Sequence, residues 1–306
     1  MISNIKINDL INYKKYEVDN LPKGVSISTM CCSAKLGCNV YTDNIQKYMT
    51  LDKDDVLTVK VNNDDKRSII DTKSKEKKKK STVKKTKQQK FYNQITIVMR
   101  INEGDTDNLN DEKKINLKLF KNGSIQMSGC KRIEEVNKVI NKLIEKLQEK
   151  KMKIKDDEVT EITFIDDPKK ININDFKIDM INSNYRVNLQ IDRSKFYNLL
   201  LKKKISASYE KCIRACVIIK YCPKEENPME KEISIFVFQK GNIIITGAKS
   251  RKHISSAYQY LNKIILEHVE EISKKNEKEE EELLLGLYDE IINENSHKLK
   301  LIMNNK

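Results

Sequence analysis

The feature that most limits how this chain can fold is an internal repeat. Segments 115–132 (INLKLFKNGSIQMSGCKR) and 233–250 (ISIFVFQKGNIIITGAKS) align without a gap at an offset of 118 residues. Six of the eighteen aligned positions are identical, and they include both glycines of each segment. Similar segments at a fixed offset indicate that the chain builds one structural unit twice.

Both copies predict a β-hairpin followed by a helix. The turns Asn122-Gly123 and Lys240-Gly241 separate pairs of strand-like runs, and glycine supplies the positive φ that a tight hairpin turn requires. After each hairpin, apolar residues recur at three- to four-residue spacing over 133–147 and 254–268. This spacing is typical of an amphipathic helix.

Further strands and a short helix precede each hairpin. Runs at 94–100 and 214–220 predict strands at an offset of 120 residues. Runs at 25–38 and 176–191 predict strands too, each followed by a short helical pattern, at 42–51 and 192–204. Their offset is about 150 residues, so the first copy contains an insertion of about 30 residues between 51 and 94.

The insertion carries most of the net charge. The chain has 59 Lys and Arg against 45 Asp and Glu, a surplus of 14 positive charges. Ten lysines and a single acidic residue lie between 73 and 90, so this tract holds nine of those charges. Without a function, this lysine-rich tract is a solvated segment. With a function, it contacts nucleic acid nonspecifically or serves as a nuclear-import signal.

The repeat divides the 306 residues into five parts. We predict an N-terminal extension at 1–24, a first repeat at 25–150 with the lysine-rich insertion at about 62–90, a charged connector at 151–173, a second repeat at 174–272 and a charged C-terminal extension at 273–306. The sequence of the C-terminal extension predicts one extra helix. Its apolar residues either pack against the rest of the protein or form a surface that binds a partner.

Several classes of protein are excluded. No apolar run approaches the roughly 18 residues that a membrane helix needs, and the polar N-terminus lacks the apolar core of a signal peptide. Seven cysteines are an odd number, which favours a reducing compartment over a disulfide framework. We therefore expect an intracellular protein without membrane contact.

Catalytic and metal-binding patterns are missing as well. The spacing of Cys212, Cys216 and Cys222 relative to His253 does not fit a zinc site, and Cys216 lies in a predicted strand. No nucleophile elbow, phosphate-binding loop or zinc-protease motif is present. We expect no metal, no cofactor and no enzymatic activity.

The twofold order of strand, short helix, strands, glycine hairpin and long helix resembles the TATA-box-binding protein family. The second repeat matches most closely, in FKIDMINSNYRVNLQI (176–191), SYEKCIRACVIIKY (208–221) and FQKGNIIITGAKS (238–250). The first repeat matches more loosely, in ISTMCCSAKLGC (27–38), QITIVMRI (94–101) and LFKNGSIQMSGCK (119–131). The lysine insertion resembles divergent members of the family from large eukaryotic DNA viruses.

This resemblance implies an α+β saddle, in which two pseudo-repeats form one curved antiparallel sheet with helices on the convex side. The concave side would bind the A·T-rich minor groove of promoter DNA as a monomer. The implied partners are double-stranded DNA, a transcription factor IIB-type protein and RNA polymerase, in the nucleus or in a cytoplasmic viral factory.

The resemblance also assigns residues to roles. The aromatic wedges that separate base steps are Phe120 and Phe238. The residues on the groove floor are Gln126, Ser128, Ile244 and Thr246, with Thr246 donating to a base acceptor. The cations that face phosphates are Arg100, Lys131, Lys220 and Lys249. The residues near the centre of the face are Thr29, Asn182 and Asn184. The partner loop contains Tyr209 and Glu210, followed by Lys211 in place of the family's usual proline.

Two departures leave alternatives open. Gln94 and Arg214 align with the family's second wedge in each half, and neither can insert as an apolar plate. The central asparagines of the family align near Thr29 and Met180 instead. A protein-interaction scaffold with weak, mostly nonspecific DNA binding is therefore a second hypothesis, and an accessory module of a nucleic-acid enzyme is a third. An alternative interpretation of Phe120 and Phe238 is that they are core aromatics. The alternative for Ser128 and Thr246 is that they are strand hydroxyls that contact no ligand.

Overall fold

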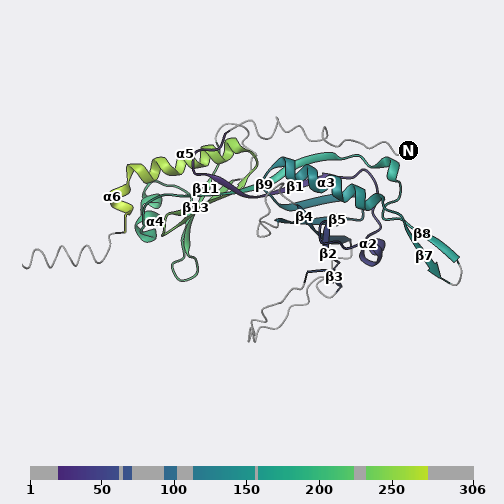
Figure 1. Ribbon diagram of the computed structural model, residues 1–306. Coiled ribbons are helices and arrows are strands. Elements are labelled where there is room, and N and C mark those ends of the chain that lie inside the picture. Colours follow the sequence, from purple (N-terminus) through teal and green to yellow (C-terminus); the bar gives the residue numbers. More distant parts are fainter. Residues whose placement is uncertain are drawn as a thin grey trace, which may run out of the picture.

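The computed structural model describes residues 20–61, 65–70, 93–101, 113–155, 158–223 and 232–274 (Figure 1). Within these residues, one antiparallel sheet has eleven strands in the order β10-β11-β12-β13-β9-β1-β6-β5-β4-β2-β3. The lysine tract at 73–90 and the helix predicted for the C-terminal extension lie outside the described residues.

The two repeats contribute equivalent elements, apart from one additional edge strand in the first repeat. The first repeat consists of β1 (Ser26–Lys35), α2 (Thr42–Tyr48), β2 (Val56–Lys60), β3 (Lys66–Ser68), β4 (Gln94–Ile101), β5 (Lys113–Phe120), β6 (Ser124–Cys130) and α3 (Ile133–Gln148). The second consists of β9 (Asn174–Arg186), α4 (Arg193–Lys202), β10 (Ala207–Ser208), β11 (Cys216–Tyr221), β12 (Ile233–Phe238), β13 (Asn242–Ala248) and α5 (Arg251–Glu267), followed by α6 (Val269–Ile272). The predicted duplication and the α+β saddle are confirmed.

A pseudo-dyad runs through the β1–β9 pair in the middle of the sheet. Met30 faces Ile181 across this ladder, and the flanking pairs, Thr29 with Asn182 and Cys31 with Met180, are related by the same exchange of repeats. Outward from this pair, each half adds its strands in mirrored order. One continuous surface therefore consists of two similar halves.

The glycine turn of each hairpin packs closely against the segment that follows the first strand of its own repeat. Gly123 and Gly241 have φ values of +76° and +77°. The N–H of each donates to the carbonyl of the phenylalanine three residues earlier, at 2.9 and 3.0 Å. A Cβ atom at Gly123 would overlap the carbonyl oxygen of Cys38, and one at Gly241 would overlap that of Val187. Both positions therefore require glycine for conformation and for space.

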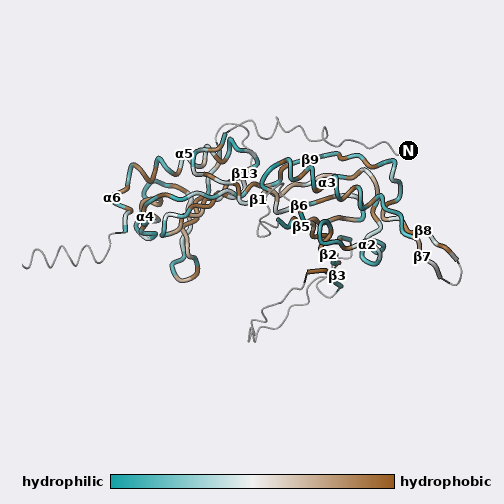
Figure 2. Tube along the Cα trace, in the orientation of Figure 1, coloured by the Kyte–Doolittle hydropathy of each residue, from teal (hydrophilic) through white to brown (hydrophobic). Residues whose placement is uncertain are grey.

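The helices α3 and α5 run along one side of the sheet (Figure 1). Their tubes alternate between teal and brown in Figure 2, as the three- to four-residue spacing predicts. Buried residues of both helices belong to one apolar cluster together with every second residue of the strands, for example Leu117, Ile125 and Ile235. We call the opposite face of the sheet, on which none of the described helices packs, the open face.

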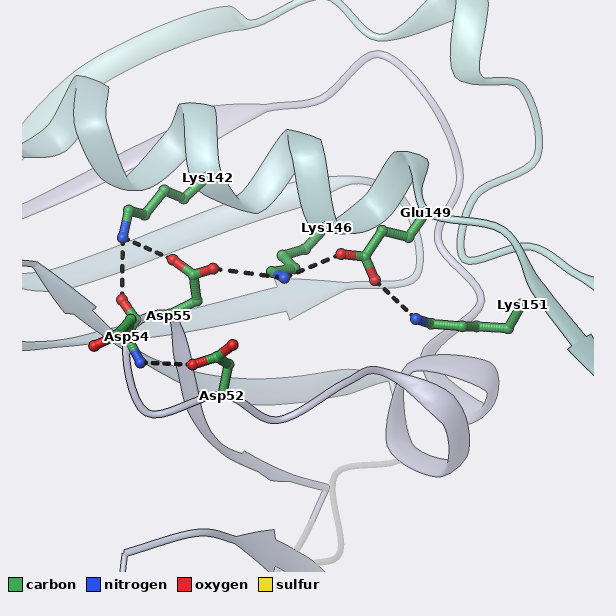
Figure 3. A network of polar contacts seen from close by, with 7 residues as sticks. All are labelled: Asp52, Asp54, Asp55, Lys142, Lys146, Glu149 and Lys151. Carbon is green, nitrogen blue, oxygen red and sulfur yellow. Dashed lines mark hydrogen bonds and ion pairs between the residues drawn. The ribbon is translucent and has the colours of Figure 1, made fainter.

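A network of charged residues fastens α3 to the loop before β2 (Figure 3). The carboxylate of Asp55 lies 2.7 Å from Lys142 Nζ and 3.5 Å from Lys146 Nζ. Lys146 Nζ also contacts Glu149 Oε1 at 3.0 Å. The hydrogen bond from Lys142 holds the pKa of Asp55 below its usual value, against the effect of partial burial.

The connector between the repeats contains structure that we did not predict. Strands β7 (Lys151–Lys155) and β8 (Glu158–Ile162) form a separate two-stranded sheet, which projects from the body in Figure 1. Lys150, which directly precedes β7, pairs with Glu161 of β8 at 2.5 Å. A 3₁₀ turn at Pro168–Lys170 then leads into β9. In the described part of the chain, no helix is long and apolar enough to span a membrane.

Candidate nucleic-acid interface

The open face is lined by the residues that alternate with the core. In β5, Ile115, Leu117 and Leu119 are buried under the helices, whereas Lys118 and Phe120 point to the opposite side. The same period of two continues through the neighbouring strands β4, β6, β12 and β13. Every residue that the sequence predicted for the wedges and the groove floor lies on this face.

The open face of the first repeat is hollowed. The hollow has a volume of about 1160 Å³ and extends from β4 across β5, β6 and β1 to the start of β9. Its lining carries four lysines, Lys35, Lys60, Lys118 and Lys177, together with two acidic residues, Asp175 and Asp179. A hollow of this kind gives the sheet a concave, mostly cationic surface.

The predicted wedges occupy equivalent places at the ends of two strands. Phe120 ends β5 and Phe238 ends β12, each directly before its hairpin turn. Both side chains are half-buried and neither belongs to the core cluster. Their positions fit apolar plates at the two ends of the open face.

The positions aligned with the second pair of wedges are not equivalent in the structure. Gln94 faces Phe120 across the β4–β5 ladder. Phe238, however, faces Cys216, because β11 begins two residues later than predicted. Arg214 lies before the strand, exposed, with its N–H donating to the carbonyl of Glu210 at 2.8 Å. The prediction that the strand starts at 214 is therefore wrong.

The groove-floor residues line up on β6 and β13. Gln126 and Ile244 are exposed, and Ser128 and Thr246 are half-buried. The hydroxyl of Thr246 donates to Asn182 Oδ1 at 2.5 Å rather than pointing freely outward. This bond occupies the amide oxygen of Asn182, so the amide NH₂ group is the donor that this pair offers to a ligand.

Two further polar residues lie near the pseudo-dyad. Thr29 Oγ1 accepts a hydrogen bond from the N–H of Gly129 at 3.0 Å, across a bulge between β1 and β6. Asn184 Oδ1 accepts from Ser26 Oγ at 2.5 Å. The centre of the open face thus has hydrogen-bonded polar groups in fixed positions, with Met180 beside them.

The four predicted cations fall into two places. Arg100 on β4 and Lys220 on β11 lie on the open face, and Lys220 Nζ donates to Ser234 Oγ at 2.8 Å. Lys131 and Lys249 are exposed in the bends that lead from β6 and β13 into the long helices. The structure therefore places two cations on the face and two at its border.

Acidic residues on the open face were missed by the sequence analysis. Asp175 pairs with Lys35 at 2.8 Å, and this contact lowers the pKa of Asp175 and raises that of Lys35. Asp179 accepts a hydrogen bond from Ser33 Oγ at 3.1 Å. Cys31 lies beside them, and burial, with the nearby Asp179 carboxylate, raises the pKa of its thiol.

Phe236 and Lys118 were also missed, although a signal for them exists. Each lies two residues before a predicted wedge on the same strand, so the alternation of β-strands places both on the same face as the wedge. The two positions are equivalent at the offset of 118 but carry different residues, so identity between the repeats does not mark them.

The predicted partner loop follows β10 at one edge of the sheet. The Tyr209 ring packs edge-on against Tyr197 of α4 at 6.0 Å between centroids, and the Arg193 guanidinium lies 5.5 Å from its centre. Glu210 is exposed. Tyr209 is thereby fixed by the helix while Glu210 faces solvent.

Among the described residues, no group of three or more His, Cys, Asp or Glu side chains is arranged to hold a metal ion. Cys212 and Cys222 are exposed, whereas Cys216 is buried.

Comparisons with known proteins agree on one family. Residues 175–268 match the family model described as transcription factor TFIID, or TATA-binding protein. The chain is 36% identical over 278 residues to a TATA-box-binding protein-like protein of Acanthamoeba polyphaga mimivirus, covering 86% of this chain and 70% of that one. Among solved structures, the TBP of Methanococcus jannaschii aligns with 79% of this chain and 98% of its own, at 16% identity and a TM-score of 0.48.

Proposed function

Since the chain belongs to the TATA-box-binding protein family, we propose that it is a transcription initiation factor that binds promoter DNA in an A·T-rich minor groove through the open face. The observation that carries the proposal is the pair Phe120 and Phe238, equivalent by the repeat and outside the core. Minor-groove architectural proteins, with the TATA-box-binding protein as their known example, insert such side chains between base steps and bend the duplex.

The polar groups of the open face support the same mode. An A·T-rich minor groove displays acceptors, so donors are needed to read it. The Asn182 amide, held by Thr246, and the lysines of the hollow are donors. Cations on and beside the face, Arg100, Lys131, Lys220 and Lys249, supply contacts to phosphates. We propose a non-enzymatic role for the chain, inside the cell.

A bending and binding measurement tests this proposal. A duplex with an A·T-rich centre carries a fluorescent donor and acceptor at its ends, and energy transfer reports the bend. The double variant Phe120→Ala/Phe238→Ala should lose bending while its circular dichroism stays unchanged. Log K should also fall with log salt, by about 0.9 per phosphate contacted. Unchanged bending would show that the wedge assignment is wrong, and a salt slope near zero would exclude phosphate contacts.

Asp175 and Asp179 favour a second candidate function. Carboxylates on a DNA-binding face repel phosphates, whereas they suit a basic protein partner. The open face would then be an interaction scaffold in a transcription complex, with weak and mostly nonspecific DNA binding. A duplex affinity no better than that of a peptide spanning residues 73–90 would favour this candidate over the first.

We also propose that the Tyr209–Glu210 loop binds a transcription factor IIB-type protein, which then recruits RNA polymerase. The support is a ring fixed by α4 beside an exposed carboxylate. Adding such a factor to the DNA complex should retard it further in a gel, and Glu210→Arg should abolish only that second shift. A second shift that survives the substitution would contradict the assignment.

A further inference from the structure

The last described residue of the chain, Lys274, lies beside the start of α4. Its N–H donates to the carbonyl of Gln190 at 2.8 Å. Ile191 and Ser273 form a β-bridge next to this bond, and α4 begins at Arg193. The C-terminal extension therefore leaves the described part of the chain at the first turn of α4.

The outer surface of α4 and of its C-terminal end is basic. Lys195, Lys203 and Lys204 are exposed, and none of the three forms an ion pair with another described residue. Lys202 pairs with Glu271 of α6 at 3.5 Å. This surface therefore carries positive charge that the described residues leave mostly without a carboxylate partner.

Exposed leucines lie in the same part of the molecule. Leu201, in the last turn of α4, is 50% exposed, and Leu266, three residues before α6 begins, is 75% exposed. Both α4 and α5 contact α6. An exposed leucine beside several lysines suits a partner segment that is both acidic and apolar.

The residues that follow in the same chain have this composition. Residues 277–282 consist of five glutamates and one lysine, and residues 283–292 read LLLGLYDEII. In the helix that the sequence predicts there, Leu284, Leu287 and Ile291 recur at three- to four-residue spacing and form one apolar stripe. The extension thus joins an acidic run to an apolar stripe.

The length of the connection fits as well. The ten residues of α4 make a helix about 15 Å long. An extended chain covers about 3.3 Å per residue, so about five residues after Lys274 bring the glutamates at 279–282 to Lys203 and Lys204. The two glutamates of α6 repel this run, and α4 is the neighbouring surface of opposite charge.

Resting on the role proposed above for the Tyr209–Glu210 loop, we propose that residues 277–292 bind along α4 of their own chain and compete there with the protein partner. The Tyr209 ring packs on Tyr197 of α4, and Arg193 of the same helix lies beside that ring. A segment on α4 is therefore next to the loop. Because the segment is tethered, its effective concentration is on the order of millimolar, and weak ion pairs suffice to hold it.

Hydrogen exchange of the full chain, followed by mass spectrometry, tests the docking. The amides of residues 284–292 should exchange slowly in the wild type and roughly fivefold faster in Lys203→Glu/Lys204→Glu, because surface ion pairs are lost. Lys169→Glu/Lys170→Glu reverses two adjacent exposed lysines of the connector and should leave the exchange unchanged. Circular dichroism checks that both variants are folded.

A charge swap distinguishes docking from a local effect of the substitutions on α4. Glu281→Lys/Glu282→Lys, added to Lys203→Glu/Lys204→Glu, restores opposite charges and should restore slow exchange. Fast exchange in the wild type, or equal exchange in the α4 and connector variants, would overturn the docking. It would also be overturned by protection that rises with protein concentration, which indicates a second copy, or that disappears on deletion of residues 73–90, which indicates binding to the lysine-rich tract.

A gel assay tests the competition. Replacing the four glutamates at 279–282 by glutamine releases the segment, so this chain on DNA should bind a transcription factor IIB-type protein about fivefold more tightly than the wild type. Equal affinity of the two chains refutes the competition and retains the partner role of the loop. A released chain that binds no such factor refutes the proposed partner role, and the competition with it, whereas hydrogen exchange decides the docking independently.

Discussion

At the residue scale, the hydrogen bond between Thr246 and Asn182 decides which group of the open face can donate to a base. The threonine hydroxyl donates a hydrogen bond to Asn182 Oδ1 and also lies 3.5 Å from Met180 Sδ. The amide is therefore held with its NH₂ group available, in a part of the face near the pseudo-dyad. Asn182 is thus the candidate donor, and Thr246 is a positioning residue.

We predict that Thr246→Val weakens binding to an A·T-rich duplex by about 1 kcal/mol, roughly fivefold in Kd, because the amide loses its fixed orientation. Thr246→Ser keeps the hydroxyl and should bind nearly as well as the wild type. Fluorescence anisotropy titrations of both variants measure the difference. If the valine and serine variants bound equally, the positioning role would be excluded.

At the scale of single elements, the start of α3 contains a buried carboxylate that is absent from the start of α5. Glu135 Oε2 accepts from Lys113 Nζ at 2.6 Å and from the N–H of Lys131 at 2.7 Å. His253 occupies the equivalent position in the second repeat, where Ser250 caps the helix instead. Burial by itself would raise the pKa of Glu135, but these hydrogen bonds outweigh it and lower the pKa below its usual range.

A carboxyl group whose pKa is lowered in the folded state stabilises the fold above its unfolded pKa, near 4.3, and that stability is lost as the pH falls through the lower folded pKa. We predict that Glu135→Gln lowers the free energy of unfolding by about 2 kcal/mol at pH 7 and that the deficit shrinks below pH 4. Urea denaturation at several pH values measures it. A deficit that was constant with pH would contradict the ionic contribution.

The sequence predicted the elements of each repeat better than their register. Residue spacing identified the hairpins and long helices, because a glycine turn and an apolar stripe are local features. The partner of Phe238, by contrast, depends on where β11 begins, and Cys216 rather than Arg214 takes that place. Ladder register depends on the loop between the strands, which differs between the repeats, and local patterns do not encode it.

The β7–β8 hairpin and the acidic residues of the open face show a second limit. The connector's charges were interpreted as those of a linker, but two strands form there, and Lys150, just before β7, pairs with Glu161 of β8. Asp179 lies on the open face because β9 pairs with β1 at the pseudo-dyad, which brings the Asp179 carboxylate next to Ser33. Such placements follow from tertiary contacts rather than from sequence spacing.

At the scale of the whole molecule, duplication supplies one continuous surface from two half-sheets, and divergence of the copies has given equivalent positions different side chains, for example Lys118 in β5 and Phe236 in β12. The backbone of such a surface is nearly twofold symmetric, but its side chains are not. We therefore expect its DNA sites to lack palindromic symmetry, in contrast to those of a symmetric dimer.

Selection of bound duplexes from a random pool at physiological salt tests the central claim most directly. Our account predicts a short A·T-enriched motif without palindromic symmetry, because the open face meets a minor groove through donors such as the Asn182 amide and through Phe120 and Phe238, and because its two halves differ in side chains. A chain lacking residues 73–90 should select the same motif. Recovery of unenriched sequences, or of a G·C-rich motif, would contradict it.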